Sequence, residues 1–134
     1  MATTDGPALR FSETFRGAEI AIEALAMGED LAVALSGGER PHIGAVALAE
    51  PHPGLDDPGR TSATASTIAR LGHREDLLAR GLSIRIAAAT GRVVVLACGI
   101  HYDDLATQEI DAVTALAGRL TERLILALRP QAPR

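Results

Sequence analysis

The apolar run RVVVLACG at residues 92–99 constrains the fold more than any other segment of the chain. Its side chains do not alternate between apolar and polar, so neither face of an extended strand would lie against water. Gly91 precedes the run and Gly99 ends it, as is typical of a strand bounded by turns. The run therefore predicts a central, well-buried strand that is covered on both faces.

Three further strands are expected before this run. Residues 18–27 alternate between apolar and polar positions, which is the pattern of a strand with one wet face. Residues 30–36 follow after a short turn, and residues 42–49 follow after the pair Gly37 and Gly38. Because these connections are short, the sequence predicts that the three strands form an antiparallel meander.

Helices are expected in the second half of the chain. Residues 50–60 are rich in proline and glycine and predict a loop. Residues 61–72 begin with serine and threonine and end in glycine, as a helix does, and residues 74–89 repeat apolar side chains at helical spacing. A last helix is predicted from about residue 107 to residue 128, because apolar residues recur at steps of three and four.

Together these elements predict a single α/β domain, with a mainly antiparallel sheet packed with helices. A length of 134 residues suits one domain. We expect the domain to span residues 18–128, between an N-terminal arm at residues 1–17 and a disordered tail at residues 129–134.

Composition excludes several classes of function. Aromatic residues make up 2% of the chain and its net charge is -4, so neither base stacking nor a basic field would attract nucleic acid. We find no signal peptide and no run of roughly 20 apolar residues, and therefore expect a cytoplasmic protein that does not bind membranes. The apolar fraction of 47% is high for a domain of this size and predicts a homodimer that buries further surface.

Two histidines stand at the ends of apolar strands. His42 begins the strand predicted at residues 42–49, and His101 follows the run at residues 92–99. If these strands lie near each other, both imidazoles line one pocket, and Asp103 orients one of them or joins them as a metal ligand. The alternative is that both are surface or turn residues, since histidines so far apart in sequence are weak evidence for a metal.

The segment RTSATAST at residues 60–67 is a candidate phosphate site. A guanidinium from Arg60 and hydroxyls from Ser62 and Thr64 at the start of a helix suit a dianion. The alternative is an ordinary helix cap with spare hydroxyls.

Four motifs, taken in order, resemble the prenylated flavin chaperone LpdD-like family. They are GG with PHIGAVALA within residues 37–49, DPGRTSATAS at 57–66, LGHRED at 71–76 and GRVVVLACGIHYDD at 91–104. The resemblance covers about residues 31–128. It implies a fold like that of the proteasome assembly chaperones.

The resemblance also implies a function. Such a protein is a non-catalytic carrier that binds prenylated FMN, or FMN, and delivers it to a UbiD-type decarboxylase or helps that enzyme mature. A flavin prenyltransferase is the second partner implied. The positions that match the family in its cofactor-binding motifs are Gly38, His42, Ile43, Gly44, Arg60, Ser62, Ala63, Thr64, His73, Gly99, Ile100 and His101.

The two lines of reasoning meet on the flavin. We expect Gly44 and Gly99 to let a flat ligand approach the backbone, beside a wall of small residues such as Ala45 and Ala47. Three other functions stay open. The chain would be an enzyme for a small molecule if His42, His101 and Asp103 form an acid–base group, a metal-binding accessory protein if they bind a divalent ion, or an assembly module that binds only protein.

Overall fold

The first three strands follow one another across one side of the sheet. The computed structural model describes residues 8–73 and 75–129. Strands β1 (Leu9–Phe15), β2 (Ala18–Met27) and β3 (Asp30–Gly38) pair in sequence, each antiparallel to the next. Residues 20, 22 and 24 of β2 are buried and Glu23 is exposed, which confirms a strand with one wet face. Residues 9–15, which sequence placed in an arm, form the edge strand β1.

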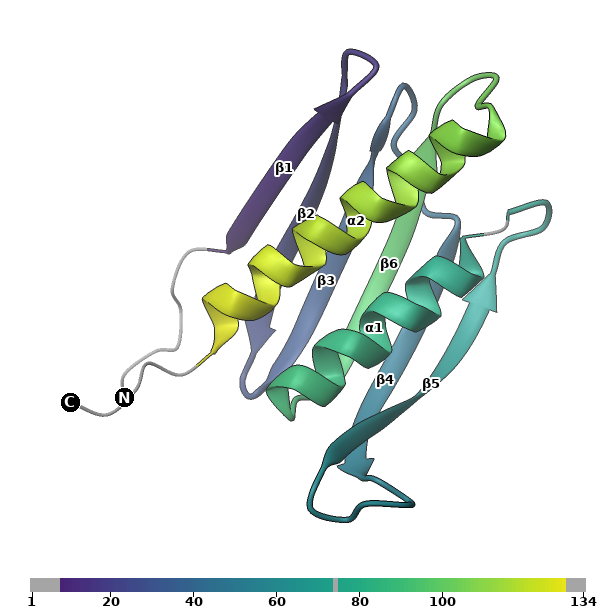
Figure 1. Ribbon diagram of the computed structural model, residues 1–134. Helices are drawn as coiled ribbons and strands as arrows, with labels where there is room; N and C mark the ends of the chain where they lie inside the picture. Colours follow the sequence, from purple (N-terminus) through teal and green to yellow (C-terminus); the bar gives the residue numbers. More distant parts are fainter. Residues whose placement is uncertain (1–7, 74, 130–134) are drawn as a thin grey trace.

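The other elements complete a two-layer α/β domain. They are β4 (Ala45–Pro53), β5 (Thr61–Ala69), α1 (Asp76–Thr90), β6 (Val94–His101) and α2 (Thr107–Leu128). The six strands form one sheet in the order β1-β2-β3-β6-β4-β5, in which only β3 and β6 are parallel neighbours. Both helices lie on the same face of this sheet, α1 over β4 and β5 and α2 over β1 and β2 (Figure 1). The structure thus confirms a single α/β domain with a mainly antiparallel sheet.

The predicted antiparallel meander is wrong at its third strand. Strand β4 does run antiparallel to β3, but β6 lies between them. The connection at residues 39–44 therefore crosses the end of β6. The crossing spans two strand spacings, or about 9.6 Å, a distance that six residues cover easily. The third strand also begins at Ala45, so His42 lies in the crossing rather than in the strand.

The helix predicted at residues 61–72 is also wrong, because this segment forms β5. Ala63 and Ala65 are half-buried and pack against the core, whereas Thr64 and Ser66 point away and are exposed. This is the period of two that a strand requires. Threonine is β-branched and favours strands, so the hydroxyl-bearing residues that resemble a helix cap belong to an edge strand.

Strand β6 is central, as predicted, but only one of its faces is covered. Leu96 and Cys98 face the helices and are fully buried, while Val95 and Ala97 on the other face are half-buried. No described helix covers that second face, so the prediction of a strand covered on both faces is wrong. Several large apolar side chains of neighbouring strands are exposed there. We call this surface the open sheet face, and its large exposed apolar members are Leu25, Met27, Leu48 and Ile68.

Helix α2 matches the prediction for residues 107–128. Val113, Ala117, Leu120 and Leu124 are buried against the sheet. At its start, the side chain of Glu109 accepts a hydrogen bond from the backbone N–H of Ala106. No described helix is long and apolar enough to span a membrane. Residues 130–134 of the predicted tail lie outside the described residues.

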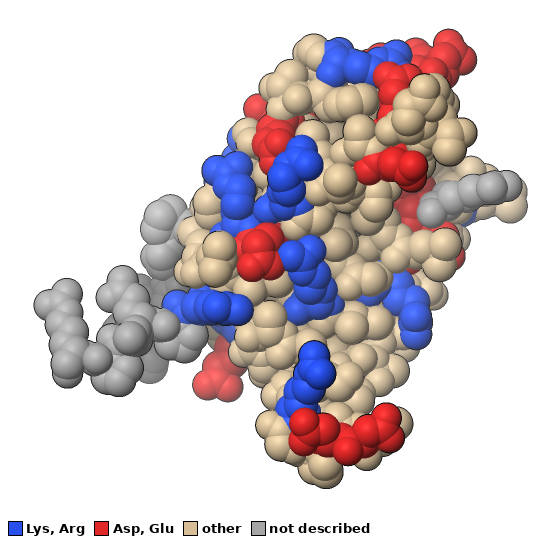
Figure 2. All heavy atoms as spheres, viewed as in Figure 1, with Lys and Arg blue, Asp and Glu red and all other residues tan. Residues whose placement is uncertain are grey.

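Charged side chains cover much of the helix-bearing face (Figure 2). Arg85 Nη2 of α1 lies 2.6 Å from Glu122 Oε2 of α2. Arg119 Nη2 of α2 lies 3.0 Å from Glu13 Oε1 of β1. These exposed pairs connect the helices to each other and to the edge strand. Ion pairs of this kind contribute little free energy, so apolar burial holds the layers together.

Candidate functional site

Four elements meet at the end of the sheet where β6 finishes and β4 begins. There the crossing at residues 39–44 supplies His42, the turn after β5 supplies His73, the residue before α1 is Glu75, and His101 ends β6. These four side chains, with Gly72 and Ile100, line one hollow of about 530 Å³. His42 and His101 therefore share a hollow, although 59 residues separate them in the sequence.

Within this hollow, His42, His73 and Glu75 are in direct contact. His42 Nε2 lies 2.8 Å from Glu75 Oε1 and 3.2 Å from His73 Nδ1. The other oxygen, Glu75 Oε2, lies 3.5 Å from His73 Nδ1. On its far side, His42 Nδ1 is 3.1 Å from the carbonyl oxygen of Arg40. We call these three side chains the His–Glu cluster.

A second polar group lies beside the cluster. His101 Nε2 is 2.8 Å from Asp103 Oδ1, and Arg40 Nη2 lies 2.8 Å from the same nitrogen and 2.9 Å from the same oxygen. The hydrogen bond from His101 holds the pKa of the Asp103 carboxyl below its usual value. A single guanidinium therefore contacts both His101 and Asp103.

The metal ligand set predicted from sequence is wrong in its members. Among the described residues, the group of possible ligands that converges is His42, His73 and Glu75. His101 and Asp103 instead form a pair with the cation of Arg40, which would repel a metal ion. Only His42 belongs to both the predicted and the observed set.

The glycines in the predicted flavin motifs make room for the protein's own atoms. A Cβ atom on Gly44 would overlap the Glu75 carboxylate, and one on Gly99 would overlap the carbonyl group of His42. Gly38 likewise lies against the carbonyl of His101. Ala45 and Ala47 are 1% and 0% exposed beneath the helices. The expected approach of a flat ligand to Gly44 and Gly99 is therefore wrong, because protein fills that space.

The predicted phosphate group lies at the opposite end of the sheet. Strand β5 runs nine residues between the two ends, which at about 3.3 Å per residue places them roughly 25 Å apart. Arg60 and Ser62 line a hollow with the carboxylates of Asp56 and Asp57 and with Ala88, near the last turn of α1. Figure 2 shows acidic side chains gathered around a basic one over this β4–β5 hairpin.

Three features of that end argue against a phosphate. The segment is a strand and offers no helix start, the carboxylates repel an anion, and the nearby end of α1 carries the negative pole of its dipole. The hydroxyl of Thr64 is also 2.7 Å from His52 Nε2. Ala63, another residue of the predicted set, is half-buried against the core.

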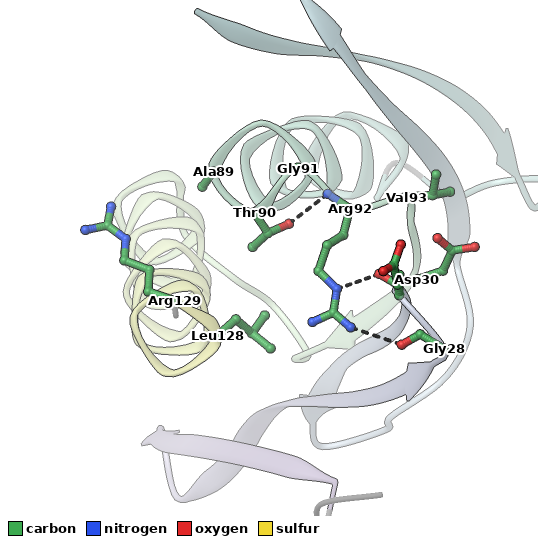
Figure 3. Close-up of a pocket in the computed structure, with 10 residues that line it drawn as sticks. Gly28, Asp30, Ala89, Thr90, Gly91, Arg92, Val93, Leu128 and Arg129 are labelled. Atoms are coloured by element: carbon green, nitrogen blue, oxygen red, sulfur yellow. Dashed lines mark hydrogen bonds between the residues drawn. The ribbon is translucent and has the colours of Figure 1, made fainter. Parts of the chain in front are cut away.

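A third hollow, of about 660 Å³, lies between the β2–β3 turn and the ends of the two helices (Figure 3). Arg92 crosses it. Its Nε donates to the carbonyl of Glu29 at 2.6 Å and its Nη2 to that of Gly28 at 3.4 Å. Because backbone carbonyls already accept hydrogen bonds from this guanidinium, Arg92 makes a structural contact between the two turns.

Sequence reasoning missed two residues of the site. Glu75 follows His73 by two positions in LGHRED, and Arg40 precedes His42 by two in ERPH. In each pair a single position separates the two residues. The nearness of Glu75 to His42 depends on the crossing over β6, and no local pattern shows that crossing.

The protein is a two-layer α/β domain in which both described helices pack on one face of the sheet, with a histidine-lined hollow at one end of the sheet. Residues 14–129 match the prenylated flavin chaperone LpdD-like domain, and the chain belongs to that family. Among solved structures, the chain is similar to one from a novel chaperone complex for yeast 20S proteasome assembly. That chain is 10% identical, with a TM-score of 0.49 over 85% of this chain and 98% of the other. Comparison with curated proteins gives no match.

Proposed function

We propose that this protein is a non-catalytic carrier that binds prenylated FMN in the hollow between His42, His73 and His101. The observation that carries the proposal is that three histidines from family-like motifs line one hollow. Membership of a prenylated flavin chaperone family supports the choice of ligand.

The lining of the hollow fits a flavin. Imidazole nitrogens offer hydrogen bonds to the polar edge of an isoalloxazine ring, and the side chain of Ile100 offers an apolar surface to its face. Ile43, which is 56% exposed in the adjoining crossing, extends that surface. Arg40 contacts His101 beside the hollow, and its side chain is 70% exposed, so its guanidinium would turn toward a phosphate.

The carrier delivers its cofactor to a UbiD-type decarboxylase and receives it from a flavin prenyltransferase. An open hollow at one end of the sheet suits transfer, because the ligand leaves without opening the core. The protein acts as a homodimer through the open sheet face. Support for the dimer is the exposure of Leu25 at 56%, Leu48 at 47% and Ile68 at 79% on that face.

The test is co-expression with a flavin prenyltransferase, followed by absorbance and mass spectrometry of the purified chain. We expect bound prenylated FMN, and retention at least about tenfold lower in His101→Ala, because one ligand hydrogen bond is lost. Arg60→Ala is the matched control at the other end of the sheet and should retain cofactor like the unchanged protein. Purified protein without flavin, or loss in Arg60→Ala alone, would contradict the proposed site.

Delivery is tested separately. Cofactor-loaded chain added to a cofactor-free UbiD-type decarboxylase should restore decarboxylation, and the chain alone should turn over no aromatic acid. Chain loaded with plain FMN is the control and should restore nothing.

A further inference from the structure

The His–Glu cluster brings together ligands from three separate segments. His42 comes from the crossing over β6, His73 from the turn after β5 and Glu75 from the residue before α1. One atom of each, His42 Nε2, His73 Nδ1 and a Glu75 oxygen, lies within 4.8 Å of the others. The fold, rather than a local motif, builds this convergence.

The hydrogen bonds of His42 show which of its nitrogens is free to act as a ligand. Its Nδ1 lies 3.1 Å from the carbonyl oxygen of Arg40, which only accepts, so Nδ1 carries the proton and donates it. In a neutral imidazole, Nε2 then presents a lone pair. That lone pair faces the Glu75 carboxylate and His73 Nδ1. A backbone carbonyl that fixes the tautomer in this way is the usual second contact of a metal-binding histidine.

With a lone pair on His73 Nδ1 as well, three electron-pair donors face one another, and a cation between them would bind all three. A second proton on His42, at Nε2, would form a hydrogen bond to Glu75 Oε1 and would leave Glu75 Oε2 without a partner. The other oxygen, Glu75 Oε2, is buried and has no hydrogen-bond partner among the described residues. A buried carboxylate oxygen without a partner is costly, and a metal ion would satisfy it together with both imidazoles.

The cluster is held in place before any ion arrives. The absence of a side chain at Gly44 leaves room for the Glu75 carboxylate, and its absence at Gly99 seats the backbone of His42. The side chains of His42, His73 and Glu75 are only 19%, 30% and 16% exposed. Ligands fixed in this way lose little conformational entropy when they bind.

Their spacing also suits an ion. Donors around a tetrahedral ion with bonds of about 2.0–2.1 Å stand about 3.3 Å apart. His42 Nε2 lies 3.2 Å from His73 Nδ1 and 2.8 Å from Glu75 Oε1, and one ligand atom from each of the three residues lies within 4.8 Å of the others. Two imidazoles and a carboxylate suit first-row divalent metals such as Zn²⁺, and three protein ligands leave a position open. We propose that His42, His73 and Glu75 bind one such ion, with the open position toward the hollow that Ile100 and His101 line. This proposal does not depend on the flavin.

Zn²⁺ is the probe for the test. Full-length protein is treated with EDTA, desalted and titrated calorimetrically, and bound zinc is counted by mass spectrometry. We expect one Zn²⁺ per chain, with affinity at least about 100-fold lower in His73→Gln and in Glu75→Gln, since each loses a ligand. His52→Gln is the control, because His52 lies near the far end of β4, and this variant should bind zinc like the unchanged protein.

Folding and ligation are separated by a second readout. His73 lies in a half-exposed turn, so His73→Gln should keep the circular dichroism spectrum of the unchanged chain. Zn²⁺ should raise the melting temperature of the unchanged protein but not that of this variant, and Co²⁺ should give visible ligand-field bands only in the unchanged protein. Absence of zinc from the unchanged protein, a stoichiometry other than one, or an equal loss in His52→Gln would overturn the assignment.

Discussion

Gly99 lies where the crossing at residues 39–44 passes the end of β6. Its missing side chain lets the backbone of His42 lie against the strand, and a Cβ atom there would overlap the His42 carbonyl. Sequence marks this position as a strand-ending glycine but does not show which segment lies on it. A single glycine therefore positions one histidine of the site. Glycine is required at residue 99 because the backbone of His42, 57 positions earlier in the chain, lies against it.

Substitution of Gly99 should therefore disturb both stability and the site. We expect Gly99→Ala to lower the free energy of unfolding by about 1–3 kcal/mol, because backbone must shift to admit the methyl group. Gly81→Ala is the control, since Gly81 is exposed within α1 and has nothing near its missing side chain. The free energy of unfolding of Gly81→Ala should rise by up to about 1 kcal/mol, because alanine has the higher helix propensity. Chemical denaturation measures both, and equal stability of the two variants would contradict the predicted overlap.

Cys98 is fully buried beside Gly99, and burial raises the pKa of its thiol to about 12. The reactive thiolate is therefore scarce at pH 8, at about one part in ten thousand. We expect a disulfide exchange reagent to label this single cysteine only slowly in the folded protein and within minutes in denaturant. Rapid labelling of the native chain at pH 8, followed by absorbance, would mean that the end of β6 opens readily.

At the scale of elements, the sequence predicts most strands and helices that have a regular apolar pattern, but it does not predict which strands pair with each other. Strands β2, β3 and β6 and helix α2 follow from apolar spacing along each segment. Strand β5 was missed because serine and threonine favour both helix caps and edge strands. The order of β3, β6 and β4 depends on contacts between distant segments, and a short connection excludes a parallel neighbour but not a strand inserted between.

Burial along α2 separates its two faces. Leu120 is 0% exposed and Leu126 is 55% exposed. We expect Leu120→Ala to lower the free energy of unfolding by about 2–5 kcal/mol, since it leaves a cavity between helix and sheet, and Leu126→Ala by less than about 1 kcal/mol. Urea denaturation followed by circular dichroism provides the comparison. Similar losses in the two variants would show that α2 packs through another face.

At the scale of the whole molecule, the two helices of the described residues both cover the same face of the sheet. The other face presents small and apolar residues of β3, β6 and β4, together with Leu25 of β2 and Ile68 of β5, and it also carries Glu19 and Glu23 of β2. Exposed large apolar side chains gathered on one face favour association, so this face is the surface that the proposed homodimer would bury.

A charge placed in this face should separate the dimer. Leu48→Arg should raise the dimer dissociation constant at least about tenfold, because a two-fold interface would bury the charge twice. Leu55→Arg is the control, since Leu55 is 93% exposed in the β4–β5 hairpin. Light scattering across a dilution series gives the association state. A chain that is monomeric at micromolar concentration, or a dimer that Leu48→Arg leaves intact, would rule out this interface.

The insertion of β6 between β3 and β4 has a consequence for the order in which the protein assembles. During synthesis, β3 and β4 leave the ribosome before the strand that joins them, so the two halves of the sheet have no common register at first. Each half exposes an unpaired edge until residues 94–101 enter the gap. The step that completes the sheet also brings His101 to the crossing that carries His42, so the hollow arises only when the last strand is in place.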